Sequence, residues 1–181
     1  LLRWNRTINL VGPATAADID RRHITDSLQL LPLLPAEGPL ADLGSGAGLP
    51  GLVLAAALPE REIHLVESDR RKAAFLVEAA GTLRLTQVKV HAVRIERAAL
   101  PPLAAITARA LAPLEVLLGH AAEFLAPGGI VRDFFVSPDG RHVAFRAEVE
   151  ASDQIDLFCA PLRRAAWLEG RRPVAQVSGP L

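Results

Sequence analysis

The chain has 181 residues, half of them hydrophobic, which is enough for one α/β domain with a buried core. Its 20 basic and 20 acidic residues leave no net charge, which argues against indiscriminate nucleic-acid binding. No apolar run approaches the roughly 18 residues of a membrane span, and the single cysteine, Cys159, allows neither an internal disulfide nor a cysteine metal cluster. We therefore expect a cytoplasmic protein that binds neither a membrane nor a metal.

Apolar spacing predicts helices near the start of the chain, over residues 2–10 and 18–34. Three apolar side chains are expected on one face of the second helix, namely Ile24, Leu28 and Leu31. Proline and glycine then interrupt the pattern between residues 35 and 39. We predict that residues 1–36 form an N-terminal helical segment.

Residues 37–130 alternate between strand patterns and helix patterns. The predicted strands cover residues 40–43, 62–67, 87–93 and 104–110. The predicted helices cover residues 50–58, 69–83 (with Asp69 as its N-cap) and 112–126. Strands that alternate with helices of this length form β-α-β units with parallel strands. We therefore predict an α/β fold with a central, mostly parallel sheet.

The rhythm changes after Gly129. Residues 130–149 are typical of two strands joined by a Ser-Pro-Asp-Gly turn at 137–140, and residues 154–161 are typical of a third strand. We predict that residues 131–181 form an atypical C-terminal β hairpin and tail.

The run GSGAGLPG, residues 44–51, follows the first strand and opens a helix. From Gly46 onwards it matches the G-x-G-x-x-G fingerprint of dinucleotide binding. With Asp42 before it, the run also matches the acid-x-G-x-G-x-G form of methyltransferases. Glu67 ends the next strand, where an acid accepts hydrogen bonds from ribose hydroxyls. A dinucleotide, S-adenosylmethionine and a purely structural turn all remain open on these residues.

Asp42 favours a cationic cofactor. It ends an otherwise apolar strand, where an ionised carboxylate costs free energy unless it is paired. The amino group and sulfonium of S-adenosylmethionine would supply positive charge, whereas the two phosphates of a dinucleotide would not. The alternative is that Asp42 only accepts hydrogen bonds from backbone amides.

Six segments occur together in an order and spacing that resemble the RsmG (GidB) family: RWNRTINLVGP, RHITDSL, DLGSGAGLPG, HLVESDRRKAAFL, RIE and TARALAPL. The resemblance covers about residues 1–130. It implies a Rossmann-like methyltransferase fold and S-adenosylmethionine as the cofactor. It also implies methyl transfer to N7 of a guanine in 16S rRNA, with small-subunit rRNA or the assembling small subunit as the partner.

The resemblance assigns further candidate site residues. Together with the glycine motif it implies eight cofactor-binding residues: Asp42, Gly44, Gly46, Leu49, Glu67, Ile95, Glu96 and Arg109. Ile95 would flank the adenine. The implied substrate-binding residues are Asn5, Arg22, His23, Asp26, Ser27 and Arg109. An equally weighted interpretation of the N-terminal residues is a capped, salt-bridged helix with Trp4 packed in the core.

The implied reaction needs no general base, because guanine N7 carries an exposed lone pair and no proton. It needs only in-line placement of N7 against the sulfonium methyl. We therefore nominate no catalytic acid or base and expect Arg109 near the substrate. Rearranged or single-stranded RNA is the expected target, since the A-form major groove hides N7.

From about Val131 the sequence departs from RsmG. Residues 131–162 resemble a blade segment of TolB-like β-propellers instead, and one blade cannot form a propeller alone. Two interpretations stay open: the segment completes the parallel sheet, with residues 130–136 as the fifth strand, or it marks a fusion or a gene-prediction error.

Two other functions also stay open. One is an NAD(P)-binding oxidoreductase, although the chain has no tyrosine for a catalytic Tyr-x-x-x-Lys pair. The other is a non-catalytic hybrid with an intact cofactor fold.

Overall fold

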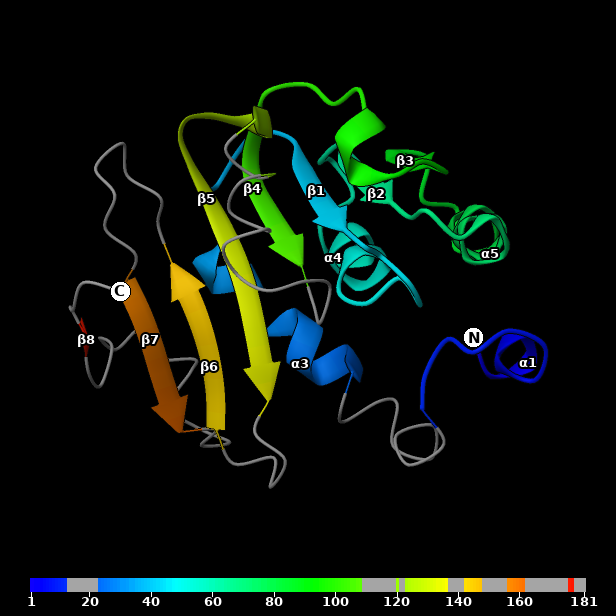
Figure 1. Ribbon diagram of the computed structural model, residues 1–181, viewed down its shortest axis with the longest axis horizontal. Helices are drawn as coiled ribbons and strands as arrows, with labels where there is room; N and C mark the ends of the chain where they lie inside the picture. The colour runs from blue at the N-terminus through cyan, green and yellow to red at the C-terminus, as the bar shows by residue number, and fades with distance from the viewer. Residues whose placement is uncertain are drawn as a thin grey trace.

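The computed structural model describes residues 1–12, 23–108, 120, 123–136, 142–147, 156–161 and 176–177. The described strands form one eight-stranded sheet in the order β3-β2-β1-β4-β5-β6-β7-β8 (Figure 1). Neighbouring strands from β3 to β5 are parallel, and those from β5 to β8 are antiparallel. The predicted α/β class with a mostly parallel central sheet is confirmed.

The parallel part contains β1 (Leu40–Leu43), β2 (Ile63–Val66), β3 (Val88–His91), β4 (Leu103–Ala108) and β5 (Leu125–Val136). The antiparallel part contains β6 (His142–Ala147), β7 (Asp156–Pro161) and β8 (Gln176–Val177). The described α-helices are α1 (Leu2–Asn5), α3 (Thr25–Leu28), α4 (Gly51–Ala57) and α5 (Arg70–Thr82). Two 3₁₀ turns are η2 (Leu31–Leu33) and η3 (Ile95–Arg97).

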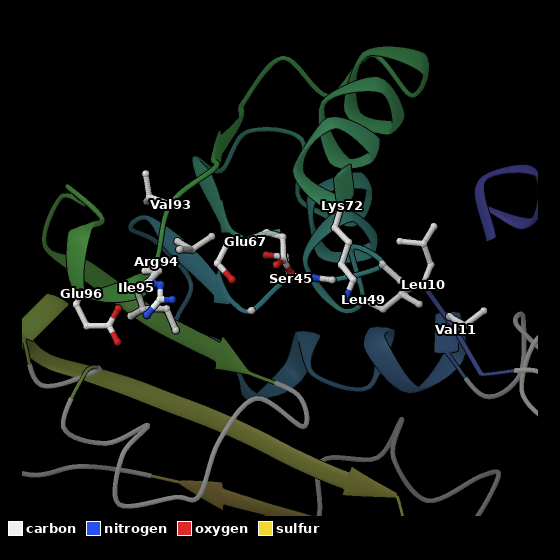
Figure 2. A pocket seen from close by; sticks show the side chains of 15 residues that line it. Leu10, Val11, Ser45, Leu49, Glu67, Lys72, Val93, Arg94, Ile95 and Glu96 are labelled. Atoms are coloured by element: carbon white, nitrogen blue, oxygen red, sulfur yellow. Dashed lines mark hydrogen bonds between the residues drawn. The ribbon is translucent and has the colours of Figure 1, made fainter. Parts of the chain in front are cut away.

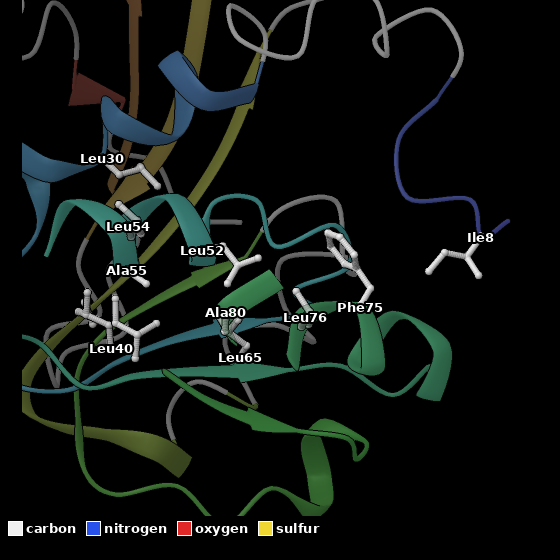
Figure 3. Close-up of a cluster of buried hydrophobic side chains, with 12 residues drawn as sticks. Ile8, Leu30, Leu40, Leu52, Leu54, Ala55, Leu65, Phe75, Leu76 and Ala80 are labelled. Carbon is white, nitrogen blue, oxygen red and sulfur yellow. The ribbon is translucent and has the colours of Figure 1, made fainter. Parts of the chain in front are cut away.

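Every residue of β1 and β2 is buried, because the two faces of the sheet border different apolar cores. On one face, Leu40 and Leu65 pack with Leu54 of α4 and Leu76 of α5 (Figure 3). Alternate strand residues point to the opposite face, where β1, β2 and β4 share a second core. The continuous apolar character of these short strands follows from burial on both faces.

The predicted N-cap of α5 is confirmed. The Asp69 side chain accepts hydrogen bonds from the backbone N–H groups of Arg71 (2.8 Å) and Lys72 (3.2 Å). These are orphan donors of the first helical turn, so the cap fixes where α5 begins. The helix therefore starts directly after the short segment that follows β2.

The N-terminal helices are shorter than predicted. The prediction of helix over residues 2–10 is wrong beyond Asn5. The Asn5 side-chain oxygen accepts hydrogen bonds from the backbone N–H groups of Leu10 and Val11, which favours a turn over a continued helix. Of the predicted helix 18–34, residues 18–22 lie outside the described part, and α3 ends at Leu28. Pro32 explains this end, because its ring clashes with the carbonyl four residues earlier.

The apolar face predicted for the second helix is only partly buried. Ile24 and Leu28 are 37% and 39% exposed, and Leu31 packs partly buried against the first core. Trp4 packs against the first core, in agreement with the interpretation of the N-terminal residues as a packed helix. Its ring meets Phe75 of α5 edge to face at 5.9 Å between centroids, so α1 lies against α5 (Figure 1).

The C-terminal strands complete the sheet. Residues 130–133 of β5 pair in parallel with β4, which confirms the predicted fifth strand. β6 and β7 then continue the sheet as the predicted antiparallel strands. The prediction of helix over residues 112–126 is wrong at its end, because β5 begins at Leu125, and its residues 112–119 and 121–122 lie outside the described part. The division at residues 36 and 130 stays a prediction.

Arg61 fastens the segment before β1 to the segment before β2. Its guanidinium donates to the carbonyl oxygens of Pro35 (2.6 Å), Glu37 (3.0 Å) and Gly38 (2.6 and 3.1 Å). A planar guanidinium can reach several acceptors at once, whereas an ammonium acts as a point charge. Arg61 therefore fixes the chain entering the first strand.

Replacing this clamp should weaken the fold. We expect Arg61→Ala to lower the free energy of unfolding by about 1–2 kcal/mol, because four hydrogen bonds are lost and the freed carbonyls regain only water. Arg61→Lys should recover part of the loss. Urea denaturation measures the change, and Arg70→Ala on the exposed start of α5 is the matched control. Equal stability of both alanine variants would contradict the clamp.

Two histidines link β2 and β3. His64 Nε2 lies 2.7 Å from Glu62 Oε1, which also accepts from Lys89 Nζ at 2.8 Å, and His64 Nδ1 lies 2.9 Å from His91 Nε2. Since the carboxylate can only accept, Nε2 carries the proton of a neutral His64, and Nδ1 accepts from His91. Burial, as the largest cause, lowers the pKa of both His64 and His91.

Stability should therefore fall in mild acid. Because the pKa of each histidine is lower in the folded state, the unfolded chain binds the proton more readily. The stability that the two neutral histidines contribute is therefore present above about pH 6.5 and is lost as the pH falls through the folded pKa values. Urea denaturation at pH 7.5 and 5.5 measures this loss. We expect a smaller loss for His91→Gln, which removes one titrating group, and an unchanged loss would contradict the assignment.

Candidate functional site

A cavity of about 610 Å³ lies beside the carboxyl ends of β1 and β2 (Figure 2). Its walls come from the glycine run after β1, the segment after β2, the first turn of α5, the segment after β3, and residues 10 and 11. β1 pairs with β2 on one side and β4 on the other, so the chain reverses its strand order here. Open α/β sheets bind ligands at this switch point.

Two glycines give the run after β1 its shape. Gly46 has a φ of 51°, a backbone conformation that residues with side chains rarely adopt. Its N–H donates to the Glu67 carboxylate. Gly51 begins α4 so close to β1 that an added Cβ would lie 2.7 Å from Asp42 Oδ2. The glycines therefore bring backbone N–H groups and the start of α4 against the ends of the strands.

Glu67 is held rigidly at the cavity wall. It is 8% exposed, its Oε2 accepts from Gly46 N at 2.8 Å, and its Oε1 accepts from Asp69 N at 2.8 Å. A carboxylate has about four acceptor positions, so each oxygen keeps capacity for another donor. The side chain can therefore receive two neighbouring hydroxyl groups without moving.

Asp42 lies behind the glycine run and not on the cavity wall. It is 2% exposed, its Oδ2 accepts from Gly51 N at 3.1 Å, and its Oδ1 accepts from Thr107 Oγ1 at 2.9 Å. These contacts match the alternative in which Asp42 accepts from backbone amides. The carboxylate is thus stabilised within the chain, and its contact with a cofactor stays a prediction.

The other predicted cofactor residues divide into two groups. Five of them line the cavity together with Glu67, namely Gly44, Gly46, Leu49, Ile95 and Glu96. Arg109 lies outside the described residues. The cofactor roles themselves stay predictions.

The predicted substrate residues that the structure describes do not line this cavity. Asn5, His23, Asp26 and Ser27 are absent from its lining, and Arg22 and Arg109 lie outside the described residues. Ser27 is fully buried and its Oγ donates to the carbonyl of His23 at 2.6 Å, as expected for packing between helical turns. Their substrate roles stay predictions.

Sequence reasoning missed several lining residues. Lys72 and Arg94 add two basic side chains to the acids Glu67 and Glu96, so the cavity carries both charges. Lys72 could have been found from its place in the first turn of α5, three residues after the Asp69 cap. Leu10 and Val11 gave no signal, because an apolar residue outside a regular element resembles any core residue.

Within the described part of the chain, no helix is long and apolar enough to cross a membrane. The same residues contain no group of three or more His, Cys, Asp or Glu side chains able to hold a metal ion.

The family model of rRNA small subunit methyltransferase G matches residues 1–134. Over 131 residues, 72% of the chain, the sequence is 59% identical to Ribosomal RNA small subunit methyltransferase G of Granulibacter bethesdensis. It is 58% identical over 134 residues to the protein of the same name from Acidiphilium cryptum. The chain spans 61% of the length of each relative.

Solved structures share the fold at low sequence identity. A SAM dependent methyltransferase from Aquifex aeolicus superposes with a TM-score of 0.53 at 17% identity, over 60% of this chain and 63% of that one. Geranyl diphosphate C-methyltransferase from Streptomyces coelicolor, solved with S-adenosyl-L-homocysteine, has a TM-score of 0.55 at 18% identity, over 67% and 47%. The sheet and helices around the cavity are therefore those of methyltransferase folds.

The hydrogen bond from Thr107 to Asp42 should contribute measurably to the free energy of unfolding. We expect Thr107→Val to lower the free energy of unfolding by about 1–3 kcal/mol, because it removes a hydroxyl that donates to a buried carboxylate. Thr107→Ser keeps the hydroxyl and should lose less. Thermal or urea denaturation measures both, with exposed Thr86→Val as control. A Thr107→Val variant as stable as the control would contradict this role.

Proposed function

Because the chain belongs to the rRNA small subunit methyltransferase G family, we propose that it binds S-adenosylmethionine and methylates N7 of a guanine in small-subunit rRNA. The proposed partner is small-subunit rRNA or the assembling small subunit. An rRNA substrate places the proposed reaction in the cytoplasm.

The observation that carries the proposal is the fixed carboxylate of Glu67. It lies at the end of β2 in the cavity, oriented by the amides of Gly46 and Asp69 before any ligand arrives. An adenosine ribose presents two neighbouring hydroxyls, which match the acceptor positions left on its two oxygens. Preorganised acceptors bind well because little ordering remains to be done.

Other lining residues fit the rest of such a cofactor. Ile95 supplies an apolar surface suited to the adenine, on one side of Glu67 in Figure 2. The glycine run lets backbone approach the ligand closely, and Leu49 closes the other side. When bound, S-adenosylmethionine supplies an electrophilic methyl group on its sulfonium.

The residues of this chain then act by placement. Guanine N7 has a free lone pair and no proton, so the site must orient the two reactants and exclude water, and no side chain has to remove a proton. Among the lining residues, Glu67 is already engaged by two backbone amides, which suits a binding role. Arg109 and the N-terminal residues Arg22, His23 and Asp26 remain candidates for contact with RNA.

Calorimetric titration tests the cofactor. We expect S-adenosylmethionine to bind the full chain and NADH not to bind. Glu67→Ala should raise the Kd for S-adenosylmethionine by roughly 10- to 100-fold, because two acceptors in a partly dehydrated site are lost. Glu60→Ala, an exposed acid before β2, is the matched control. Preferential binding of NADH would favour the oxidoreductase and overturn the proposal.

Methyl transfer tests the reaction. Tritium from labelled S-adenosylmethionine should appear in small ribosomal subunits that lack the modification, and at lower rate with Glu67→Ala. Digestion of the labelled RNA should place the label on guanine N7. Cofactor binding without transfer to either naked rRNA or subunits would support the non-catalytic hybrid instead.

A further inference from the structure

We propose that Asn5 is a positioning residue that builds one wall of the cofactor cavity and raises affinity for S-adenosylmethionine. This role differs from the RNA contact that the family resemblance implied for it. The inference rests on the proposed function for the identity of the ligand. Its structural part, the ordering of residues 5–11 by one side chain, rests on contacts within the chain alone.

The amide of Asn5 closes a loop on its own backbone. Its Oδ1 accepts from the N–H groups of Leu10 (2.8 Å) and Val11 (2.9 Å), and its Nδ2 donates to the carbonyl of Val11 (3.1 Å). Both lone pairs of Oδ1 are therefore used. Such a side chain offers a substrate little beyond one N–H, but it determines the path of the backbone between residues 5 and 11.

The loop that Asn5 closes carries two residues of the cavity wall. Leu10 and Val11 line the cavity, and Figure 2 shows them beyond Leu49, on the opposite side of Glu67 from Ile95 and Glu96. Val11 is 7% exposed and so packs against the protein as well as facing the cavity. The wall exists only while the backbone of residues 10 and 11 is held in this place.

The base of the loop is fastened to α5. Trp4, next to Asn5, donates from Nε1 to Glu78 Oε1 at 3.0 Å and meets Phe75 edge to face. The same helix carries Lys72, another lining residue, and its N-cap is Asp69, whose amide orients Glu67. The position of Leu10 and Val11 is thereby set relative to the ribose acceptor.

Loss of the Asn5 contacts should reduce affinity through ordering. Without them, residues 6–11 sample other conformations, and each backbone residue that must be ordered on binding opposes association. Rigidity that is already present in the free protein therefore appears as a lower Kd. The loop also carries Ile8, which is 6% exposed and belongs to the first core, so melting temperature has to be measured beside affinity.

The full chain and three variants test the inference by calorimetry with S-adenosylmethionine and by hydrogen–deuterium exchange of the ligand-free protein. We expect Asn5→Ala to raise the Kd about tenfold and to speed exchange at the amides of Leu10 and Val11. Asn5→Asp keeps the accepting oxygen and should lie between wild type and Asn5→Ala. Asn9→Ala, an exposed asparagine in the same loop, should match wild type.

Faster exchange in Asn5→Ala with an unchanged Kd, or unchanged exchange at both amides, would overturn the inference. A melting temperature lowered equally in Asn5→Ala and Asn5→Asp, with equal affinities, would show a merely structural role and also overturn it. Failure of the wild-type chain to bind S-adenosylmethionine would instead overturn the proposed function. The exchange measurement needs no ligand and so separates the two failures.

Discussion

The buried carboxylate of Asp42 is the interaction on which the site depends. It joins three elements: its own strand β1, the first amide of α4 at Gly51, and the hydroxyl of Thr107 in β4. A carboxylate can be buried only when such donors satisfy it, and in return it fixes where those donors lie. The glycine run between β1 and α4 is thereby held in one shape. That shape directs the N–H of Gly46 at Glu67 and orients the acid at the cavity wall.

The cavity is lined by residues from consecutive elements of the sheet and by two residues that are distant from them in the sequence. The glycine run, Glu67 and Lys72 lie within two successive β-α-β units, β1-α4-β2 and β2-α5-β3, so their meeting follows from the parallel sheet and the short connections between its elements. Leu10 and Val11 come from residues 1–12, which as described contain no strand, and they reach the cavity because Trp4 packs on α5 and Asn5 closes the loop. A ligand in this cavity would contact both sets of residues at once.

The far edge of the sheet illustrates how tolerant strand pairing is. β6 to β8 continue the sheet beyond β5, although the family model that matches residues 1–134 ends before these strands begin. Backbone hydrogen bonds do not depend on side-chain identity, so a hairpin with strand propensity can pair with any open edge of compatible register. The cavity lies beside β1, β2 and β3, on the other side of β4 from these added strands.

The sequence by itself determined the α/β class, the strands and helices between residues 40 and 108, the Asp69 cap and the place of Glu67, because period, glycine spacing and capping are local properties of the chain. It also predicted the strands after Gly129 from their alternation and turn. Tertiary structure decided what depends on distant contacts. Asp42 finds its donors in Gly51 and in Thr107, 65 residues away. The N-terminal helices are cut short by Asn5 and Pro32, and two apolar residues of the first 12 become a cavity wall. Local sequence patterns cannot predict such effects, because the residues adjacent to a side chain in the sequence do not determine which distant residues it will contact in the fold.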